Sequence, residues 1–354
     1  MLIKYNKGFS LIELMLAMMI GIIIIGGVLS LYINSRDTQR AWEDQMQLLF
    51  DSRFVMETIG YDLRHAGVFG RNNMPRTIHC GSYDTSCDVT DKLPLAVDDC
   101  VNEWYISLDQ PMVASDDNAI IDGADYSGTC ASKGYKSNTD MLGVHYADPT
   151  RIQDDQLAAS LTYVRSNTVA GGLFVGSVIP GYETYKWESQ HSWHPVNNPT
   201  GATSNHRLVG HLYYVSDYTD AVGDGVPSLR RAELESGPAM NDQVLLSGVE
   251  DMQLQFGVTT SGTPSAFPDT YVAADNIPTY PGTANKDWSR VRSVKIWILM
   301  RSEREDRDIS SVQTFTIAGN SVTTPSDGYY RKLFSGIINL RNTIRLDESA
   351  ASGG

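Results

Sequence analysis

The chain begins with an apolar run long enough to cross a membrane. Its twenty-five residues from Phe9 to Ile33 include only Ser10, Glu13 and Ser30 as polar side chains. A helix of this length can span a hydrocarbon core of about 30 Å. A carboxylate inside such a segment costs about 2.5–3.5 kcal/mol at the centre and less near an end, so it usually has a function. Any fold for this chain must therefore explain Glu13.

Three interpretations of this run compete. A removable secretory signal fits the basic Lys4 and Lys7, but such signals have a shorter apolar region of about 7–15 residues and a small-x-small cleavage site. A plain N-terminal anchor, with its N-terminus held in the cytoplasm by these lysines, explains the length but not Glu13. Cleavage between Gly8 and Phe9 explains both, because it frees an α-amine one helical turn from Glu13, and opposite charges attract strongly in a low dielectric.

The sequence Gly8-Phe9-Ser10-Leu11-Ile12-Glu13, followed by the apolar run, resembles the class III signal of type IV pilins and type II secretion pseudopilins. The resemblance implies removal of residues 1–8 by a prepilin peptidase, N-methylation of Phe9, and docking of Glu13 against the N-terminus of a neighbouring subunit. It also implies an α+β, type IV pilin-like fold, in which a long N-terminal helix packs on a mainly antiparallel β head. Residues 9–33 would be the membrane and filament-core part of that helix.

Residues 34–66 are expected to continue the helix as an amphipathic segment. No proline occurs in them, and large apolar residues recur at steps of three, four and five. This predicted stripe consists of Trp42, Met46, Leu49, Phe50, Phe54, Ile59 and Leu63. A single amphipathic stripe most often forms core, so we expect it to pack against the head; a partner surface is the alternative.

Residues 67–354 are expected to form the mainly β head, because short β-like runs alternate with Gly, Asn, Asp, Ser and Pro clusters. The clearest predicted strand is Val249–Val258, which alternates with the period of two of a sheet with one buried face. The run from Val294 to Met300 gives a second. Weaker predicted strands are Met141–Ala147, Ser160–Arg165, Leu173–Ile179, Arg207–Ser216, Val312–Ile317 and Tyr330–Leu340.

Three segments of the C-terminal half resemble the PilW family of minor pilins, which is related to the J-type minor pseudopilins of type II secretion. These segments are Leu246–Val258, Val291–Ser302 and Leu333–Asn342. Residues 75–203, which hold all the cysteines, match poorly. The resemblance implies a structural, low-abundance subunit that helps to initiate the filament and sits near its tip.

The four cysteines, Cys80, Cys87, Cys100 and Cys130, are clustered. In the oxidising compartment expected for an exported head, two disulfides are favoured over free thiols. Short loops close at less entropic cost, which favours Cys80–Cys87 with Cys100–Cys130, and Cys80–Cys100 with Cys87–Cys130 is the alternative. The spacings lack a C-x₂₋₄-C pair, which disfavours zinc.

The sequence shows no pattern typical of an enzyme. His191 and His194 have a spacing that could place two ligands on one helical face, but Pro195 follows at once and favours a loop with solvated histidines. The net charge of −14 is spread along the chain. It indicates a solvated surface and makes nucleic acid an unexpected partner.

Oxygen ligands that a calcium ion could use occur in two places. These are Asp220–Gly225, and Asp116–Asn118 with Asp122 and Asp125. Neither fits the EF-hand loop, and turn chemistry explains these residues equally well. We therefore expect no metal and no cofactor, with calcium as the minority alternative.

The pilin resemblance implies a non-enzymatic minor pilin of a type IV pilus. Its expected partners are other minor pilins, the major pilin, the prepilin peptidase and the inner-membrane assembly platform, with a tip adhesin as a further candidate. We expect a single-pass inner-membrane subunit with a cytoplasmic N-terminus and a periplasmic head, later carried in the pilus fibre at the cell surface. The alternatives are a minor pseudopilin of type II secretion and, less favoured, a surface binding module or enzyme anchored by a pilin leader.

Overall fold

The structure is a computed structural model. It describes residues 8, 10–72, 78–79, 108, 110–121, 123–128, 130–167, 171–177, 204–235, 240–260, 267–279, 286–306, 309 and 311–342. The predictions that concern Phe9, Cys80, Cys87, Cys100, Asp122, His191 and His194 lie outside these residues. The chain divides into two compact units, residues 1–50 and residues 51–354.

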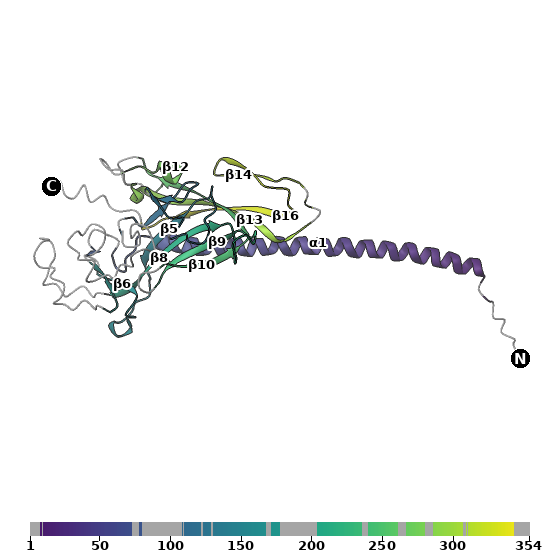
Figure 1. The fold of residues 1–354 in the computed structure, drawn as a ribbon, viewed down its shortest axis with the longest axis horizontal. Coiled ribbons are helices and arrows are strands. Elements are labelled where there is room, and N and C mark those ends of the chain that lie inside the picture. The colour runs from purple at the N-terminus through teal and green to yellow at the C-terminus, as the bar shows by residue number, and fades with distance from the viewer. Residues whose placement is uncertain are drawn as a thin grey trace, which may run out of the picture. The chain divides into compact units, whose positions relative to one another are not determined.

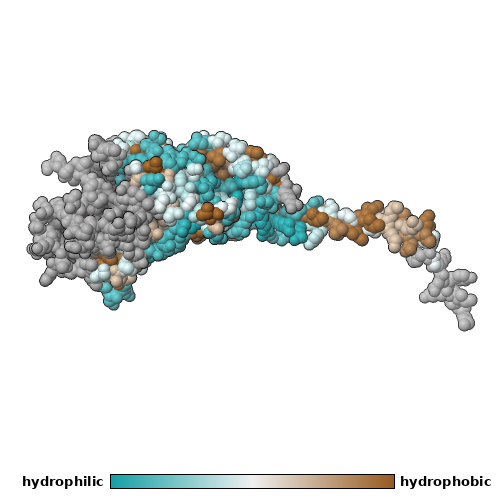
Figure 2. Space-filling view, viewed as in Figure 1, coloured by the Kyte–Doolittle hydropathy of each residue, from teal (hydrophilic) through white to brown (hydrophobic). Residues whose placement is uncertain are grey.

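A single helix, α1 (Leu11–His65), follows the N-terminal motif (Figure 1). No proline occurs within it. Its N-terminal part is long and apolar enough to cross a membrane, and none of that apolar window is buried. Figure 2 shows hydrophobic residues on the surface of this part of the helix. The expected continuation of the helix beyond its apolar part is confirmed, because α1 runs without a break to His65.

In the second unit, the last turns of α1 lie in the core of the head. Val55, Ile59 and Leu63 are fully buried on one side of the helix, and Ala66 is buried just after it. Their spacing of four, four and three residues is that of one helical face. The helix therefore contributes an apolar ridge to the head.

The predicted apolar stripe is only partly right. Ile59 and Leu63 are buried, but its other members, Trp42, Met46, Leu49, Phe50 and Phe54, are exposed. Each residue advances about 100° around an α-helix. Four-residue steps therefore stay close to one face, whereas the five-residue step from Phe54 to Ile59 turns by about 140°. The stripe combines two faces, and only the second lies in the core of the head.

An eight-stranded sheet forms one part of the head (Figure 1). Its order is β1-β7-β6-β8-β5-β2, with β9 paired to β8 and β10 paired to β9. All pairs are antiparallel except β1 with β7. The strands are β1 (Ile78–His79), β2 (Met112–Ala114), β5 (Leu142–Ala147), β6 (Thr162–Ser166), β7 (Gly171–Val175), β8 (Ser204–Ser216), β9 (Ser228–Leu234) and β10 (Met240–Ser247).

A second, four-stranded antiparallel sheet has the order β12-β11-β13-β16. Its strands are β11 (Val249–Val258), β12 (Thr270–Val272), β13 (Val291–Glu305) and β16 (Tyr329–Asn339). Two small hairpins complete the described strands, β3 (Ile120–Ile121) with β4 (Ala124–Asp125) and β14 (Thr314–Ile317) with β15 (Asn320–Thr323). Short 3₁₀ turns lie at Asp154–Gln156, Ala274–Asn276 and Trp288–Arg290.

The inner face of the four-stranded sheet lies against α1. Gly336 on β16 faces Met56, and a Cβ at this glycine would collide with the Met56 methyl group. Gly60 lies beside Ile338 in the same way, since a Cβ there would be 3.5 Å from the Ile338 side chain. Asn342 then donates a 2.6 Å hydrogen bond to the carbonyl of Arg64 near the helix end. The expected architecture, a long helix packed on antiparallel sheets, is confirmed.

Most predicted strands are found, and β11 has the predicted bounds. However, its polar face is not open to solvent, because Asp251 and Gln253 are buried. The sequence does not predict β9 and β10. Their inward positions include Arg230 and Asp242, which form a buried 2.6 Å ion pair. Because two charged residues occupy buried positions, the apolar–polar alternation that would predict these strands is missing.

Candidate functional site

The N-terminal motif lies at the start of α1. Gly8 is exposed, and a Cβ at this position would have open space around it. Ser10 precedes the first helical residue, and its backbone N–H donates a 3.0 Å hydrogen bond to the carboxylate of Glu13. This contact is the carboxylate half of a capping box. In the single chain, the exposed Glu13 therefore satisfies the first turn of its own helix.

Cys130 is the one cysteine among the described residues. It is buried, and it is disulfide-bonded. Its partner lies outside the part of the chain that the structure describes, so the pairing of Cys100 with Cys130 and its alternative both stay predictions.

One of the two acidic stretches that could bind calcium is used as a turn. The Asp224 carboxylate accepts hydrogen bonds from the backbone N–H groups of Val226 (2.8 Å), Asp220 (2.9 Å) and Ala221 (3.2 Å). These backbone donors hold the pKa of Asp224 at about 2. Turn chemistry thus accounts for Asp224 and its flanking residues.

A buried acidic junction joins the other stretch to β11. The two carboxylate oxygens of Asp140 accept the backbone N–H groups of Asp117 (2.8 Å) and Leu254 (2.7 Å). The Gln253 amide then donates to Asp117 (2.9 Å) and Asp251 (3.2 Å). Burial raises the pKa of Asp140 to about 8 and that of Asp251 to about 6. Among the described residues, no group of three or more His, Cys, Asp and Glu side chains could hold a metal ion.

A second buried network ties α1 to the eight-stranded sheet. The Asp62 carboxylate accepts hydrogen bonds from the Tyr146 hydroxyl (2.8 Å), His211 Nδ1 (2.5 Å) and the Tyr213 hydroxyl. His211 Nε2 lies 3.9 Å from Glu233. Asp62, His211 and Tyr213 are all nearly inaccessible to solvent. The helix is therefore attached to β5 and β8 by a buried charge as well as by apolar packing.

The pKa values of this network move in opposite directions. Burial raises the pKa of Asp62, but the hydrogen bonds and charge of His211, with the two tyrosine hydroxyls, outweigh it and lower the pKa. Burial lowers the pKa of His211, but Asp62 and Glu233 outweigh it and raise the pKa. The contact with His211 holds the pKa of Glu233 at about 2. The geometry therefore favours a protonated His211 between two carboxylates.

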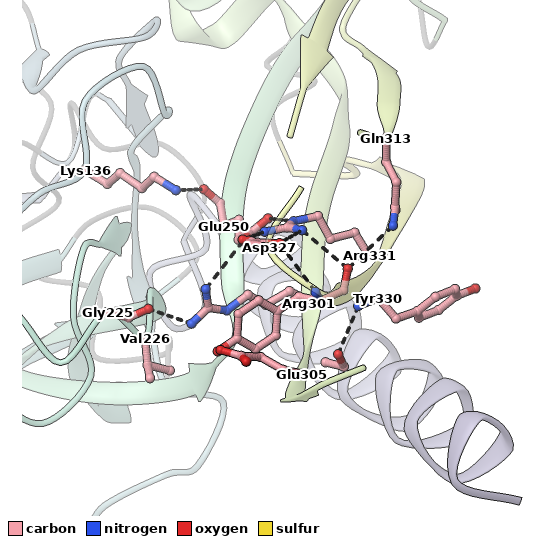
Figure 3. Close-up of polar contacts among 12 residues, drawn as sticks. Lys136, Gly225, Val226, Glu250, Arg301, Glu305, Gln313, Asp327, Tyr330 and Arg331 are labelled. Atoms are coloured by element: carbon pink, nitrogen blue, oxygen red, sulfur yellow. Dashed lines mark hydrogen bonds and ion pairs between the residues drawn. The ribbon is translucent and has the colours of Figure 1, made fainter. Parts of the chain in front are cut away.

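An arginine cluster fixes the start of β16 (Figure 3). The Arg331 guanidinium is almost fully buried and makes two hydrogen bonds to Glu250 (2.6 and 2.8 Å) and two to Asp327 (both 2.6 Å). Arg301 lies 3.8 Å from Glu250 and donates a 2.6 Å hydrogen bond to the Gly225 carbonyl. The cluster thus joins β11, β13 and β16 to the turn before β9.

One serine–histidine pair resembles a catalytic arrangement in its distances. Ser204 Oγ lies 2.8 Å from His206 Nε2, and His206 Nδ1 lies 2.7 Å from the Asp148 carbonyl. Both side chains are only 5% exposed on β8. A nucleophile must reach its substrate, and this burial favours a structural hydrogen bond.

Comparisons with known proteins agree with the N-terminal motif and with the C-terminal sheet. Residues 3–29 match the family model described as the prokaryotic N-terminal methylation motif. Together with the long helix and the antiparallel head, this match defines the class as a type IV pilin-like protein. Residues 212–342, which contain β11, β13, β16 and the arginine cluster, match the family described as type IV pilus-assembly protein W. The two matches give the chain the N-terminal motif of this class and a C-terminal part that is similar to the PilW family.

Two further comparisons add little to this identification. No curated protein matches the chain. A type IV-like pilin from Thermus thermophilus is similar to it at 12% sequence identity and a TM-score of 0.33, over 84% of this chain and 97% of that chain. The identification therefore depends on the two family matches.

Sequence reasoning missed Asp62, His211 and Arg331. In the sequence they look like ordinary charged residues of a solvated surface. The one available signal for Asp62 is its position between Ile59, Leu63 and Ala66, on the face that is buried. The arginine at 331 has no comparable signal, because its partners Glu250 and Asp327 come from separate segments.

Proposed function

We propose that this protein is a minor pilin that helps to initiate type IV pilus assembly and sits at or near the filament tip. The observation that carries the proposal is the Gly8–Glu13 motif at the start of an exposed apolar helix. The PilW family match supports it. A low-abundance structural subunit of this kind has no catalytic site and no cofactor.

In this proposal, the chain is inserted with its N-terminus in the cytoplasm and its head in the periplasm. The prepilin peptidase removes residues 1–8, and the new N-terminus at Phe9 is methylated. The subunit leaves the membrane through the inner-membrane assembly platform, exchanging lipid contacts for helix–helix contacts. Because both are apolar, close packing and polar pairing decide which helices associate. Glu13 supplies such a pairing with a neighbouring N-terminus.

The decisive experiment separates docking by Glu13 from capping of its own helix. Glu13→Gln keeps an acceptor for the Ser10 N–H but removes the charge, whereas Glu13→Ala removes both. Each variant would replace the chromosomal copy, and insertion, cleavage after Gly8 and surface pili would be measured. We expect both variants to be inserted and cleaved, and both to enter pili poorly. Normal incorporation of Glu13→Gln would show that the cap is sufficient and would contradict charge docking.

A bulky residue at Gly8 tests the processing step. Gly8→Phe places a side chain at the proposed cleavage site, where the structure has open space and so no folding penalty. We expect an uncleaved precursor that stays in the membrane. Recovery of mature-length protein by mass spectrometry would contradict the assignment of Gly8.

The tip position is supported by the size of the head, which need not repeat along a crowded shaft if it sits at the end. Poorly matched residues 75–203 suit display there, next to other minor pilins, the major pilin or a tip adhesin. Gold-labelled antibody to the head should mark fibre ends, and regular labelling along the shaft would contradict this placement. A minor pseudopilin of type II secretion is the second candidate, and loss of secretion with normal pili in a deletion strain would favour it.

A further inference from the structure

Strand β16 has one free edge in the described part of the head. It pairs with β13 over nearly its whole length, from Tyr329 to Asn339. It is the last strand of the order β12-β11-β13-β16, and no other described strand pairs with it. An unpaired edge exposes a row of backbone donors and acceptors to which another chain can add a strand.

Two backbone hydrogen bonds show which residues of β16 face the free edge. The Leu340 N–H donates to the Arg292 carbonyl (2.8 Å), and the Arg301 N–H donates to the Gly248 carbonyl (2.8 Å), away from β16. In an antiparallel strand, the N–H and C=O of one residue point to the same side and alternate along the strand. Even-numbered residues of β16 therefore pair with β13. The N–H and C=O groups that point to the free edge belong to Leu333, Ser335, Ile337 and Asn339.

This edge is open. Ser335, Ile337 and Asn339 are exposed, and the large apolar Ile337 is 55% exposed. The helix α1 does not account for them, because Met56 and Gly60 lie against the even-numbered residues on the inner face. Beside the edge, Ile337 is thus an exposed apolar side chain that no described residue covers.

The edge lacks some of the usual protections against pairing. Proteins block edge strands with prolines, bulges, inward-pointing charges or charged side chains on the edge strand, lysine above all. The β10 edge has two of these devices, a register shift between Val244 and Leu246 and the inward-pointing Asp242. From Arg331 to Asn339, β16 has no proline, and its pairing with β13 shows no register shift. Unlike the β10 edge, β16 thus has only one such device, Lys332, and a lysine does not repel an acidic strand.

The charge near this edge differs from that of the whole chain. The protein has 42 acidic residues and a net charge of −14, yet none occurs from Gly328 to Leu346. Lys332 lies on β16, and the exposed Arg341 follows the strand. Arg331 is neutralised within its cluster, whereas Lys332, which lies over the Phe334 ring, and Arg341 have no carboxylate partner among the described hydrogen bonds and ion pairs. Charge complementarity therefore selects an acidic partner.

We propose that residues 333–339 of β16 form a docking edge for an extended, acidic strand of another protein subunit. The added strand pairs with the outward backbone groups of Leu333, Ser335, Ile337 and Asn339, as in β-strand addition. An apolar partner residue covers Ile337, and acidic side chains face Lys332 and Arg341. That the partner is a pilus subunit rests on the proposed function, but the docking edge itself does not.

Because the backbone groups of β16 alternate between β13 and the free edge, one substitution can affect the edge alone. Proline at position 335 removes an outward N–H but no hydrogen bond to β13, so Ser335→Pro should keep the fold. A photo-crosslinking amino acid at Asn339 of the full-length protein in cells would report the neighbour, and one at the 84% exposed Val222 would serve as the control site. Mass spectrometry would locate the crosslinked segment of the partner.

We expect an adduct from position 339 to an extended acidic segment, with at least a tenfold loss in Ser335→Pro and unchanged melting of the head. If Ser335→Pro fails to fold, Lys332→Glu with Arg341→Glu tests the same edge without touching the backbone, and the same loss is expected. No adduct, or an adduct that survives these variants, would overturn the docking edge. An edge-dependent adduct to a protein outside the pilus machinery would support the edge and contradict the proposed function.

Discussion

Replacement of Asp62 by alanine tests whether the buried charge holds the helix to the head. The change leaves Tyr146, His211 and Tyr213 with buried donors that have lost their shared acceptor. Breaking a buried, charge-paired contact by removing one partner costs about 3–5 kcal/mol. A large domain loses roughly 2 °C of melting temperature per kcal/mol, so we expect a decrease of about 6–10 °C.

The assay is thermal unfolding of the full chain in detergent, with near-ultraviolet circular dichroism as the signal of tertiary structure. Glu57→Ala is the matched control, since Glu57 is an exposed acidic residue on the same helix, and a surface change of this kind stays within about 0.5 kcal/mol. Asp62→Asn, which keeps the size and one acceptor oxygen, should fall between the two. A decrease of under about 2 °C in Asp62→Ala would refute the view that this network holds the helix.

The same network predicts how stability depends on pH. The pKa of His211 is raised in the folded state, so its contribution is fully present below the ordinary value of 6.5 and is lost as the pH rises through the folded pKa. The pKa values of Asp62 and Glu233 are lowered, so their contributions are present above the ordinary values of 3.8 and 4.5 and are lost in acid. The network should stabilise the head most between pH 4.5 and 6.5, and Asp62→Ala should flatten this maximum.

Three further changes test other parts of the head. Arg331→Met leaves Glu250 and Asp327 without their shared cation. We expect the free energy of unfolding, measured with denaturant, to fall by about 2–4 kcal/mol. A decrease under about 0.5 kcal/mol would contradict the role of the cluster. Gly248 has a φ of +81°, and a Cβ there would lie 2.9 Å from the Arg301 carbonyl. In the same assay, Gly248→Ala should lower the free energy of unfolding by about 1–3 kcal/mol. An unchanged free energy of unfolding would show that alanine is not strained at this position. The pKa of Asp140 is raised to about 8 in the folded state. Its contribution to stability is therefore present below the ordinary pKa of 3.8 and is lost as the pH rises to about 8. Asp140→Asn should reduce the decrease in melting temperature between pH 5 and 8, and an unchanged decrease would show that another group causes it.

The sequence predicts the helix and the clearest strands because both depend on local patterns. The apolar run from Phe9 fixes the helix by composition, and Val249–Val258 shows its strand by alternation. The Gly8–Glu13 motif is also local. These features need no knowledge of distant residues.

The buried polar contacts could not be predicted because they are long-range. Asp62 meets Tyr146, His211 and Tyr213 at sequence separations of 84, 149 and 151 residues. The residues adjacent to Asp62 in the sequence do not indicate these partners, and a hydropathy pattern predicts an exposed aspartate. The error in the apolar stripe has a related cause, since the choice between two helix faces depends on which one the sheets cover.

The Asp62 network also has a mechanical consequence. A subunit pulled by its helix transmits tension to the head through the contacts of α1 with the sheets. Apolar contacts yield gradually as surfaces slide, whereas hydrogen bonds weaken steeply once distance or angle departs from the optimum. Three such bonds converge on Asp62, so this part of the junction is stiff under small loads and fails abruptly under large ones. Asp62 thus adds a stiff contact to the apolar packing by which the junction resists such a load.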